Sequence, residues 1–362
     1  MPQKQYKITI LIDSAAVPQE DRQFLTQPKT LTTEYCVIQT IRKLGHEVII
    51  TPVEDSIKTL ANQLKQQKPH LVFNLTEEFR GDRRKDKIIT AMLENLKIPF
   101  TGTDSAGLAL CRNKKLCKQI LARHKINVPD CLFFPPGRKV TLPKTIRFPM
   151  IVKPAFEDGS EGISNASIVD SARTLKQRVR FVTRKWKQPA ITEEYIKGRE
   201  FYVGIIGNEK LKTLPIRECI FNNKNISGPC LATYRVKWNE KYRNKWNVKF
   251  GFAKLDDDIT KKIHRICKKT YKLLRLRDYG RIDLRLTSEN KIVILEVNAN
   301  PDVKYGEELA EAAKKAGITY KEFLSQIISN ALARKTRQSF YLPSKADLRA
   351  NRPLKQGCGG DD

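Results

Sequence analysis

The first hundred residues alternate between short apolar runs and helix-like segments, and this alternation limits the fold more than any other feature. Apolar runs occupy residues 7–13, 46–53 and 70–76. Segments whose apolar residues have helical spacing lie between them, at 33–44 and 56–67. Strands that alternate with helices form parallel sheets with right-handed crossovers. The sequence therefore predicts an α/β domain with a parallel sheet at the N-terminus.

The stretch GRIDLRLTSENKIVILEVNANP, residues 280–301, predicts two strands around a turn at 288–290. Side chains two residues apart on a strand share a face, so Glu296 and Asn298 point together and a paired strand can bring Asp283 beside them. Three such oxygen ligands suit Mg²⁺ that is also bound to substrate phosphates. Arg281 shares the face and offers a guanidinium to anionic oxygens. On spacing alone, an ordinary hairpin with a surface ion pair is the alternative.

The chain carries a formal net charge of +29, which is spread through the sequence and peaks in two segments. Residues 171–187 and 259–277 both show an apolar stripe at helical spacing and a basic opposite face. Such a surface attracts anionic partners, or it reflects a general preference for Lys and Arg. Because no basic motif with interleaved aromatic residues is present, nucleic acid is not an expected partner.

Several classes of protein are not expected from composition. The sequence has no run of 18 apolar residues and no signal-peptide pattern at its start, so neither a membrane span nor export is predicted. Its eight cysteines are scattered and form no C-x-x-C pair. A zinc site is therefore not predicted, and free thiols in a reducing cytoplasm are expected.

The segment KPAFEDGSEGIS, residues 153–164, predicts a phosphate-binding loop after a strand. Gly159 and Gly162 let backbone N–H groups approach phosphate oxygens, and the hydroxyl of Ser160 adds a donor. Lys153 supplies a positive point charge. The loop has neither the Walker A order nor G-x-G-x-x-G, and a hairpin loop is the alternative.

A third segment, ITEEYIKGREF, predicts an extended connection between two strands. Backbone groups at Tyr195 and Ile196 could hydrogen-bond an adenine edge, while the carboxylate of Glu193 or Glu200 holds ribose hydroxyls. Taken alone, this pattern is a weak one.

In their order along the chain these segments closely resemble the ATP-grasp superfamily, and within it the D-alanine–D-alanine ligase branch. The resemblance covers residues 7–333, and its strongest points are VFNLTEEFRGD, IPFTG followed by RNK, the KP strand with its loop, EEYIKGREF and RID…LEVN. It implies an α/β protein, α+β in its C-terminal part, with a Rossmann-like domain followed by two subdomains that clasp ATP. The implied boundaries are 1–104, 105–196, 197–333 and a basic, disordered tail at 334–362.

The resemblance also implies a role for each matching residue. Lys114 and Lys153 would hold ATP phosphates, under the loop from Gly159 to Gly162. Glu193 and the backbone of Tyr195 and Ile196 would meet the adenine, and Glu200 the ribose. Two Mg²⁺ ions, replaceable by Mn²⁺, would bind Asp283, Glu296 and Asn298. The catalytic residues would be Arg281 at the tetrahedral intermediate, Ser160, and Lys237, which a mobile lid at 222–252 brings to the γ-phosphate.

The acceptor half departs from the family. Where a Ser-Leu element holds the carboxylate of the second substrate, this chain has Lys304, Tyr305, Glu307 and Glu308. The acid expected after the first strand is replaced by DSAAVPQEDRQF, and the lid tyrosine by Trp238. We therefore expect an ATP-dependent carboxylate–amine ligase that works through an acyl phosphate, on substrates other than two D-alanines. An acidic acceptor, such as a glutamyl peptide or a protein tail, would suit the positive surface.

Two alternatives stay open at this point. One is another ATP-grasp enzyme, such as a glutamate-adding ligase or a carboxylase-type activator. The other is a non-catalytic protein that binds anions or RNA on the same fold. The family is usually dimeric, so a homodimer is possible.

Overall fold

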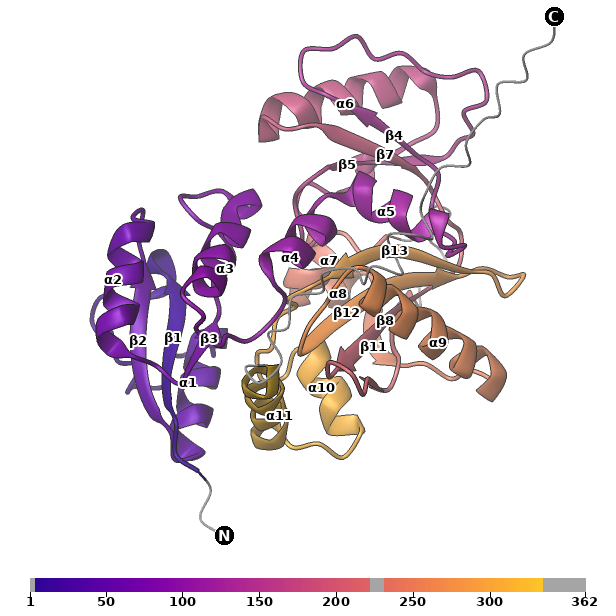
Figure 1. The fold of residues 1–362 in the computed structure, drawn as a ribbon. Coiled ribbons are helices and arrows are strands. Elements are labelled where there is room, and N and C mark those ends of the chain that lie inside the picture. The colour runs from indigo at the N-terminus through magenta and orange to yellow at the C-terminus, as the bar shows by residue number, and fades with distance from the viewer. Residues whose placement is uncertain (1–3, 222–230, 335–362) are drawn as a thin grey trace, which may run out of the picture.

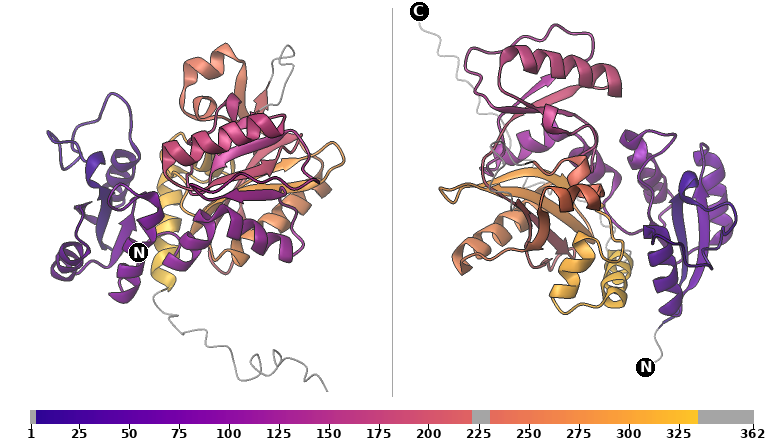
Figure 2. Two further views of the ribbon diagram at one scale, coloured as in Figure 1. Left: turned by 90° about the horizontal axis from the view of Figure 1, so that it is seen from above. Right: turned by 180° about the vertical axis from the view of Figure 1, so that it is seen from behind.

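The structure, a computed structural model, describes residues 4–221 and 231–334. Its described residues form three β-sheets that follow one another along the chain. Figure 1 and Figure 2 show the first sheet beside the other two, which lie one above the other. No helix in the described ranges is both long and apolar enough to cross a membrane.

The first sheet is parallel, as predicted, with the order β2-β1-β3. It consists of β1 (Lys7–Asp13), β2 (Glu47–Val53) and β3 (Leu71–Asn74). Alternate residues of β1 enter two cores, because successive side chains of a strand point to opposite faces. Ile8, Ile10 and Ile12 pack with α1 (Thr33–Lys43), while Leu11 packs with α2 (Ile57–Gln67) and α3 (Asp86–Asn95).

The second sheet is antiparallel and has the order β4-β7-β5-β6. Its strands are β4 (Cys131–Phe134), β5 (Met150–Pro154), β6 (Ile168–Val169) and β7 (Ala190–Glu194). The helix α6 (Ala172–Trp186) covers one face through Leu175, Val179 and Val182. Ser171 begins this helix with a capping box, which confirms the predicted basic helix.

The third sheet is the largest and carries the hairpin predicted at 280–301. Its path is β11 (Val248–Phe252), β10 (Arg217–Phe221), β8 (Arg199–Ile206), β12 (Tyr279–Leu286) and β13 (Ile292–Asn298), with β9 (Lys212–Thr213) paired to β8. The amphipathic helix α9 (Asp257–Leu273) packs Ile263, Cys267 and Tyr271 against it. Both basic helices therefore bury their apolar stripes in a core.

The remaining helices join the sheets. The helices α4 (Ser105–Arg112) and α5 (Lys114–Arg123) place Leu108, Cys117 and Leu121 in the core of the third sheet. Asp104 caps α4 by accepting a hydrogen bond from the N–H of Gly107. The helices α10 (Glu308–Lys315) and α11 (Tyr320–Ala333) contribute to the core beside β1. The domain boundaries at 104, 196 and 333 stay a prediction.

The segment predicted as a disordered or lid-like loop, 222–252, contains regular structure in its second part, so the prediction was wrong there. Residues 231–252 form α7 (Tyr234–Trp238), α8 (Glu240–Lys245) and β11. Val236 and Val248 enter a small core with Tyr202 and Cys219, which holds the segment against the third sheet. Residues 222–230 and the predicted tail beyond 334 lie outside the described residues.

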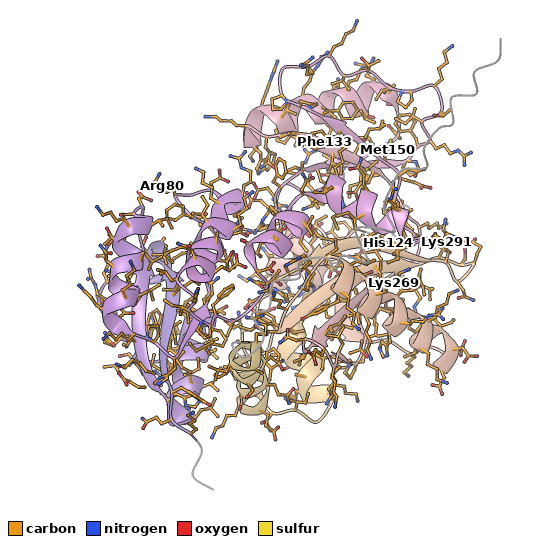
Figure 3. All side chains as sticks on the ribbon, in the orientation of Figure 1. Arg80, His124, Phe133, Met150, Lys269 and Lys291 are labelled. Carbon is orange, nitrogen blue, oxygen red and sulfur yellow. The ribbon has the colours of Figure 1, made fainter. Side chains whose placement is uncertain are left out.

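Positive charge is spread over the surface. Figure 3 shows Arg80 on one side of the molecule and Lys269 and Lys291 on the other, and all three side chains are exposed. The positive charge is therefore not confined to a single patch that contains all three residues.

Candidate active site between the second and third sheets

The hairpin β12–β13 brings the predicted metal ligands together. Asp283 lies directly opposite Glu296, and Arg281 directly opposite Asn298. Opposite residues of an antiparallel pair project to the same face, so all four side chains share one face. The register shifts between Asp283 and Leu284, a β-bulge of the kind that often re-aims side chains at functional sites.

This set of side chains fits a magnesium ion. Two carboxylates and one amide are hard oxygen donors, and Mg²⁺ completes such a set with water and phosphate oxygens. The buried Nδ2 of Asn298 has no hydrogen-bond partner in the protein, so the amide has unused hydrogen-bonding capacity at this site. Among the described residues no group of three His, Cys, Asp or Glu side chains could hold a metal ion, which leaves this mixed set as the candidate.

The two predicted phosphate-binding lysines are paired with carboxylates. Lys114 Nζ lies 2.8 Å from Glu296 Oε1, and Lys153 Nζ lies 2.6 Å from Glu193 Oε2. Burial alone would lower the pKa of Lys114, but the nearby carboxylates of Glu296 and Asp158 raise it. Lys114 is therefore a fully charged cation at neutral pH.

A third lysine joins this group, although the sequence did not reveal it. Lys118 Nζ lies 3.2 Å from Glu193 Oε1 and donates to the carbonyl of Leu295 at 2.7 Å. Burial would raise the pKa of Glu193, but Lys118 and Lys153 outweigh it and lower that pKa. Lys118 follows Lys114 by four residues on α5, and this spacing, which puts both side chains on one helix face, was the signal that could have found it.

The predicted ribose ligand, Glu200, is held by an arginine that sequence reasoning also missed. Arg285 Nη2 lies 2.7 Å from Glu200 Oε2, and Tyr202 Oη donates to Glu200 Oε1 at 2.8 Å. Arg285 Nη1 also donates to the carbonyl of Ile196 at 2.6 Å. The guanidinium lies 4.9 Å from the ring centroid of Tyr195. Arg285 therefore ties the predicted adenine segment to Glu200.

The peptide groups of the predicted adenine segment are partly used within the protein. The N–H of Tyr195 donates to Pro149 at 3.1 Å, and the carbonyl of Ile196 accepts from Arg285. The carbonyl of Tyr195 and the N–H of Ile196 are the groups that the proposed adenine contact would use.

The glycine- and serine-containing loop has the backbone conformation that its residues predict. Gly159, Ser160 and Gly162 all have positive φ, at 60°, 65° and 73°. A Cβ at Gly162 would lie 2.6 Å from Pro154 Cγ, so a side chain does not fit there. Ser160 Oγ donates to the carbonyl of Ala232 at 2.9 Å, so in this structure its hydroxyl bridges the loop to the segment before α7.

Arg112, at the end of α4, anchors the same loop and was not predicted. It forms ion pairs with Asp158 in the loop and with Asp86 of α3, the latter at 2.5 Å. Burial raises the pKa of Asp86, although the charge of Arg112 and its hydrogen bond to this carboxylate act to lower it. This network connects the loop with the first domain.

Arg281 forms two ion pairs, and the predicted lid lysine, Lys237, lies on a different element. Arg281 Nε lies 2.8 Å from Asp283 Oδ1, and Nη1 lies 3.0 Å from Glu308 Oε2. Lys237 falls in α7, which puts it on the segment that carries Thr233 and Tyr234. Its side chain lies outside the described residues.

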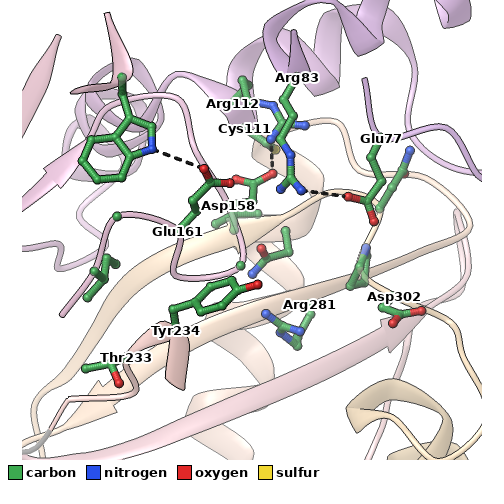
Figure 4. Close-up of a pocket in the computed structure, with 18 of the residues that line it drawn as sticks. Glu77, Arg83, Cys111, Arg112, Asp158, Glu161, Thr233, Tyr234, Arg281 and Asp302 are labelled. Carbon is green, nitrogen blue, oxygen red and sulfur yellow. Dashed lines mark hydrogen bonds and ion pairs between the residues drawn. The ribbon is translucent and has the colours of Figure 1, made fainter. Parts of the chain in front are cut away.

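Part of this site lines one large cavity, while the side chains of Lys114, Lys153, Glu193, Glu200, Asp283 and Glu296 are not among its lining residues. Its volume is about 1120 Å³, and its lining includes Gly159, Gly162, Arg281 and Asn298. Figure 4 shows Arg281, Tyr234, Glu161 and Asp158 around the open space. Cavities that bury drug-sized ligands span roughly 300–1,000 Å³, so this one has room for a phosphate chain and two small reactants.

Comparison with known proteins identifies the family that carries such a site. Residues 124–329 match the family model described as D-ala D-ala ligase C-terminus. A D-alanine–D-alanine ligase of Aquifex aeolicus is 33% identical over 300 residues, which span 83% of this chain and 94% of that protein. An uncharacterized protein of Sinorhizobium fredii is 29% identical over 82% of this chain and 86% of its own length.

Solved structures agree on the fold. A D-alanine–D-alanine ligase from Bacillus anthracis, complexed with ATP, aligns with a TM-score of 0.70 and 20% identity over 91% of this chain and 99% of that one. The VanG D-Ala:D-Ser ligase from Enterococcus faecalis aligns with a TM-score of 0.65 and 17% identity over 91% of this chain and all of that one (100%). At these identities the likeness concerns the fold alone.

Proposed function

This chain belongs to the D-alanine–D-alanine ligase family, a group of ATP-dependent ligases with the ATP-grasp fold, and we propose that it joins a carboxylate to an amine through an acyl phosphate. The observation that carries the proposal is the hairpin face on which Arg281, Asp283, Glu296 and Asn298 stand together. Lys114 pairs with Glu296 of this face, and Gly159 and Gly162 of the glycine-containing loop line the cavity beside Arg281 and Asn298. A non-catalytic relative would have no need for this full set.

Charge explains how the site would drive the first step. A carboxylate oxygen attacks the γ-phosphorus of ATP, the bond to the β–γ bridging oxygen breaks, and ADP leaves. Both reactants are anions, so cations must offset their repulsion. Lys114 and Lys153 are buried cations that can exchange a protein carboxylate for a phosphate oxygen.

The second step forms the amide bond. The amine nitrogen attacks the acyl carbon and gives a tetrahedral oxyanion. The nitrogen gives up one proton, the carbon–oxygen bond to the phosphoryl group breaks, and phosphate leaves with that proton and with one oxygen of the original carboxylate. Donors aimed at such an oxyanion typically contribute about 3–4 kcal/mol each. Arg281 is the cation on the hairpin face that lines the cavity, and we assign it this role. The loop from Gly159 to Gly162 would exclude water from the acyl phosphate.

Magnesium is part of the proposal. Asp283, Glu296 and Asn298 would hold the ion or ions, with Mn²⁺ as a possible substitute, and the bound metal would neutralise charge on the β- and γ-phosphates. The donor types and their shared face on the hairpin support this assignment.

The nucleotide would lie across the two antiparallel sheets. We assign Glu193 and the Tyr195–Ile196 backbone to the adenine and Glu200 to the ribose. Their positions support this assignment. Glu193 lies on β7 and pairs with Lys153, Tyr195 and Ile196 follow β7, and Glu200 lies at the start of β8. Ser160 and Lys237 are proposed at the phosphates, on the loop and on α7.

The identity of the substrates is a separate question. The names of the relatives would suggest D-alanine on both sides, but Glu307 and Glu308 line the cavity here. The carboxylates of an acidic acceptor would instead meet Arg178, Lys185 and Arg235, which also line the cavity. We also propose that the enzyme works in the cytoplasm, since it needs ATP and six described cysteines are free thiols.

Trapping of the acyl phosphate tests the proposal. The full-length protein with Mg²⁺ and ATP is incubated with hydroxylamine and a panel of amino acids and dipeptides. We expect ADP and a hydroxamate in equal amounts with at least one carboxylate, and loss of both with Asp283→Asn. Release of ADP that is independent of every carboxylate, or unchanged in Asp283→Asn, contradicts the assignment.

A further inference from the structure

Two carboxylates of the chain form ion pairs with Arg281, which lines one part of the cavity, called the Arg281 end below. Its Nε lies 2.8 Å from Asp283 Oδ1, and its Nη1 lies 3.0 Å from Glu308 Oε2. The side chains of Arg281 and Glu308 are only 15% and 17% exposed. Solvent therefore screens this pair weakly, and an acceptor carboxylate at Arg281 would compete both with Glu308 and with the oxyanion that we assign to this guanidinium.

The other cations at this end are paired as well. Arg83 lies 3.2 Å from Glu77, and Lys304 lies 3.2 Å from Glu307. Asp302 adds a carboxylate that accepts hydrogen bonds from the hydroxyl of Thr33 and the N–H of Lys304. Figure 4 shows Arg281, Asp302 and Glu77 grouped toward one end of the cavity, away from Thr233.

The Arg281 end of the cavity therefore contains several carboxylates, although the chain as a whole carries a net charge of +29. Its lining includes Glu77, Asp302, Glu307 and Glu308. Partial desolvation inside the cavity raises the pKa of Glu77, and the carboxylates of Asp302 and Asp158 add to this in opposition to Arg83. Asp302 and Asp158 thus oppose the ionisation of Glu77 although Arg83 pairs with it, and an added cation would relieve this repulsion.

An α-amino acid would be a poor acceptor in these surroundings. Its carboxylate would either compete with Glu308 for Arg281 or lie among Glu77, Asp302 and Glu307. An amine without a carboxylate avoids both costs, and a second ammonium group would gain from the same carboxylates. Repulsion between like charges can therefore exclude a ligand that carries a carboxylate, just as favourable contacts can select one that does not.

We propose that Glu308 is a specificity-determining residue that makes the acceptor an amine with no carboxylate beside its reacting nitrogen, and preferably a diamine. The inference rests on the proposed function, since it names the acceptor of the same reaction. It concerns only the Arg281 end of the cavity, so it is compatible with acidic groups bound elsewhere in the cavity.

Glu308 also has a purely structural interpretation, and the chain offers a matched control for it. An acidic residue in the first turn of a helix is stabilising, and α10 has two of them, Glu308 and Glu311. Glu311 is not part of the cavity lining. Glu311→Gln therefore removes the same charge from the same helix turn without changing the cavity.

Equilibrium binding tests the proposal without depending on turnover. Calorimetric titration of the full-length protein, with Mg²⁺ and a non-hydrolysable ATP analogue, compares ethylamine with alanine and 1,5-diaminopentane with lysine. The members of each pair differ by one carboxylate. We expect the amine to bind at least tenfold more tightly in both pairs. Glu308→Gln should reduce this preference at least fivefold, while Glu311→Gln keeps it.

Three results would overturn the proposal: amino acids that bind as tightly as the matched amines, equal effects of Glu308→Gln and Glu311→Gln, or no binding of any of the four. Failure of the ligase assignment is read separately, from ADP and hydroxamate formation in the trapping experiment. A protein that prefers the amines but forms no hydroxamate would support the acceptor site and refute the ligase.

Discussion

Lys114 Nζ lies 2.8 Å from Glu296 Oε1, so a cation proposed for the ATP phosphates and a carboxylate proposed for the metal neutralise each other. Lys114 is nearly buried, and Glu296 lies on the hairpin face with Asp283. Nucleotide without metal would take Lys114 from Glu296 and leave that carboxylate without its cation. Binding of the metal and the nucleotide should therefore be coupled.

The first prediction concerns this coupling. Mg²⁺ should tighten binding of a non-hydrolysable ATP analogue by at least ~10-fold, within the usual range of coupling free energies of about 1–3 kcal/mol. In Glu296→Gln the lysine keeps only its more distant carboxylate partner, Asp158 at 3.8 Å. Metal-free nucleotide should then bind more tightly than in the wild type, and the effect of Mg²⁺ should fall below ~3-fold. Calorimetric titration measures both quantities.

Glu289→Gln is the control for that experiment, because Glu289 is exposed at the turn of the same hairpin. It should behave as the wild type. An unchanged effect of Mg²⁺ in Glu296→Gln would mean that Glu296 does not connect the two ligands.

A second prediction concerns Glu193, which is 1% exposed between Lys118 and Lys153. Loss of one partner from a buried ion pair typically costs about 3–5 kcal/mol, because the remaining charge is left without compensation. Glu193→Gln should lower the free energy of unfolding by about that amount. Urea titration followed by circular dichroism measures it, and Glu194→Gln, next in sequence and exposed, is the control. Equal stability of the two variants contradicts the buried pairing.

A third prediction concerns Arg285, whose guanidinium contacts Glu200, Ile196 and the ring of Tyr195 at once. A lysine has one ammonium and cannot reproduce these contacts. Arg285→Lys should raise the KM for ATP about tenfold with a smaller change in kcat, because the residue shapes the nucleotide site and does not touch the reacting atoms. Steady-state ADP release at saturating carboxylate gives both constants.

Arg199→Lys serves as the control for Arg285→Lys. Arg199 also pairs with a glutamate, Glu218 at 2.7 Å, but its side chain is 45% exposed. A decrease in kcat alone for Arg285→Lys would instead argue that Arg285 acts in the chemical step.

A fourth prediction concerns the pH dependence of stability at Asp13. Burial, with added repulsion from Glu78 and Glu77, raises the pKa of Asp13 to about 6. The folded state therefore disfavours the ionised form, so Asp13 lowers stability above pH 6 and this cost disappears as the pH falls toward 4. Asp13→Asn should stabilise the protein at pH 8 by about 1–2 kcal/mol, after allowance for partial exposure. Thermal unfolding should show this gain shrinking through pH 6, and a gain that grows toward pH 4 contradicts the sign.

Periodicity predicted the fold well where elements are long enough to show it. The N-terminal strands, the two basic helices and the 280–301 hairpin all occur within a few residues of their expected limits. The shared face of Asp283, Glu296 and Asn298 also followed from strand geometry alone. Residues 231–252 were mispredicted because α7 and α8 have only five and six residues. A helical period needs a longer window than that to become visible.

The contacts within the site were less accessible from the sequence. Arg285 is separated from Glu200 by 85 residues, and Lys118 from Leu295 by 177. No local pattern pairs such distant positions, since tertiary packing of different elements creates the contact. Arg112 depends in the same way on Asp86 and Asp158, which lie on two other elements.

The central claim is that a carboxylate is activated by phosphoryl transfer on the face of Asp283 and Glu296. The most direct measurement uses the donor carboxylate labelled with ¹⁸O and follows the label during amide formation by mass spectrometry. Attack of the carboxylate on the γ-phosphate and departure of phosphate from the acyl carbon predict one ¹⁸O atom in each phosphate released. Phosphate without label, or label in AMP, would contradict the account.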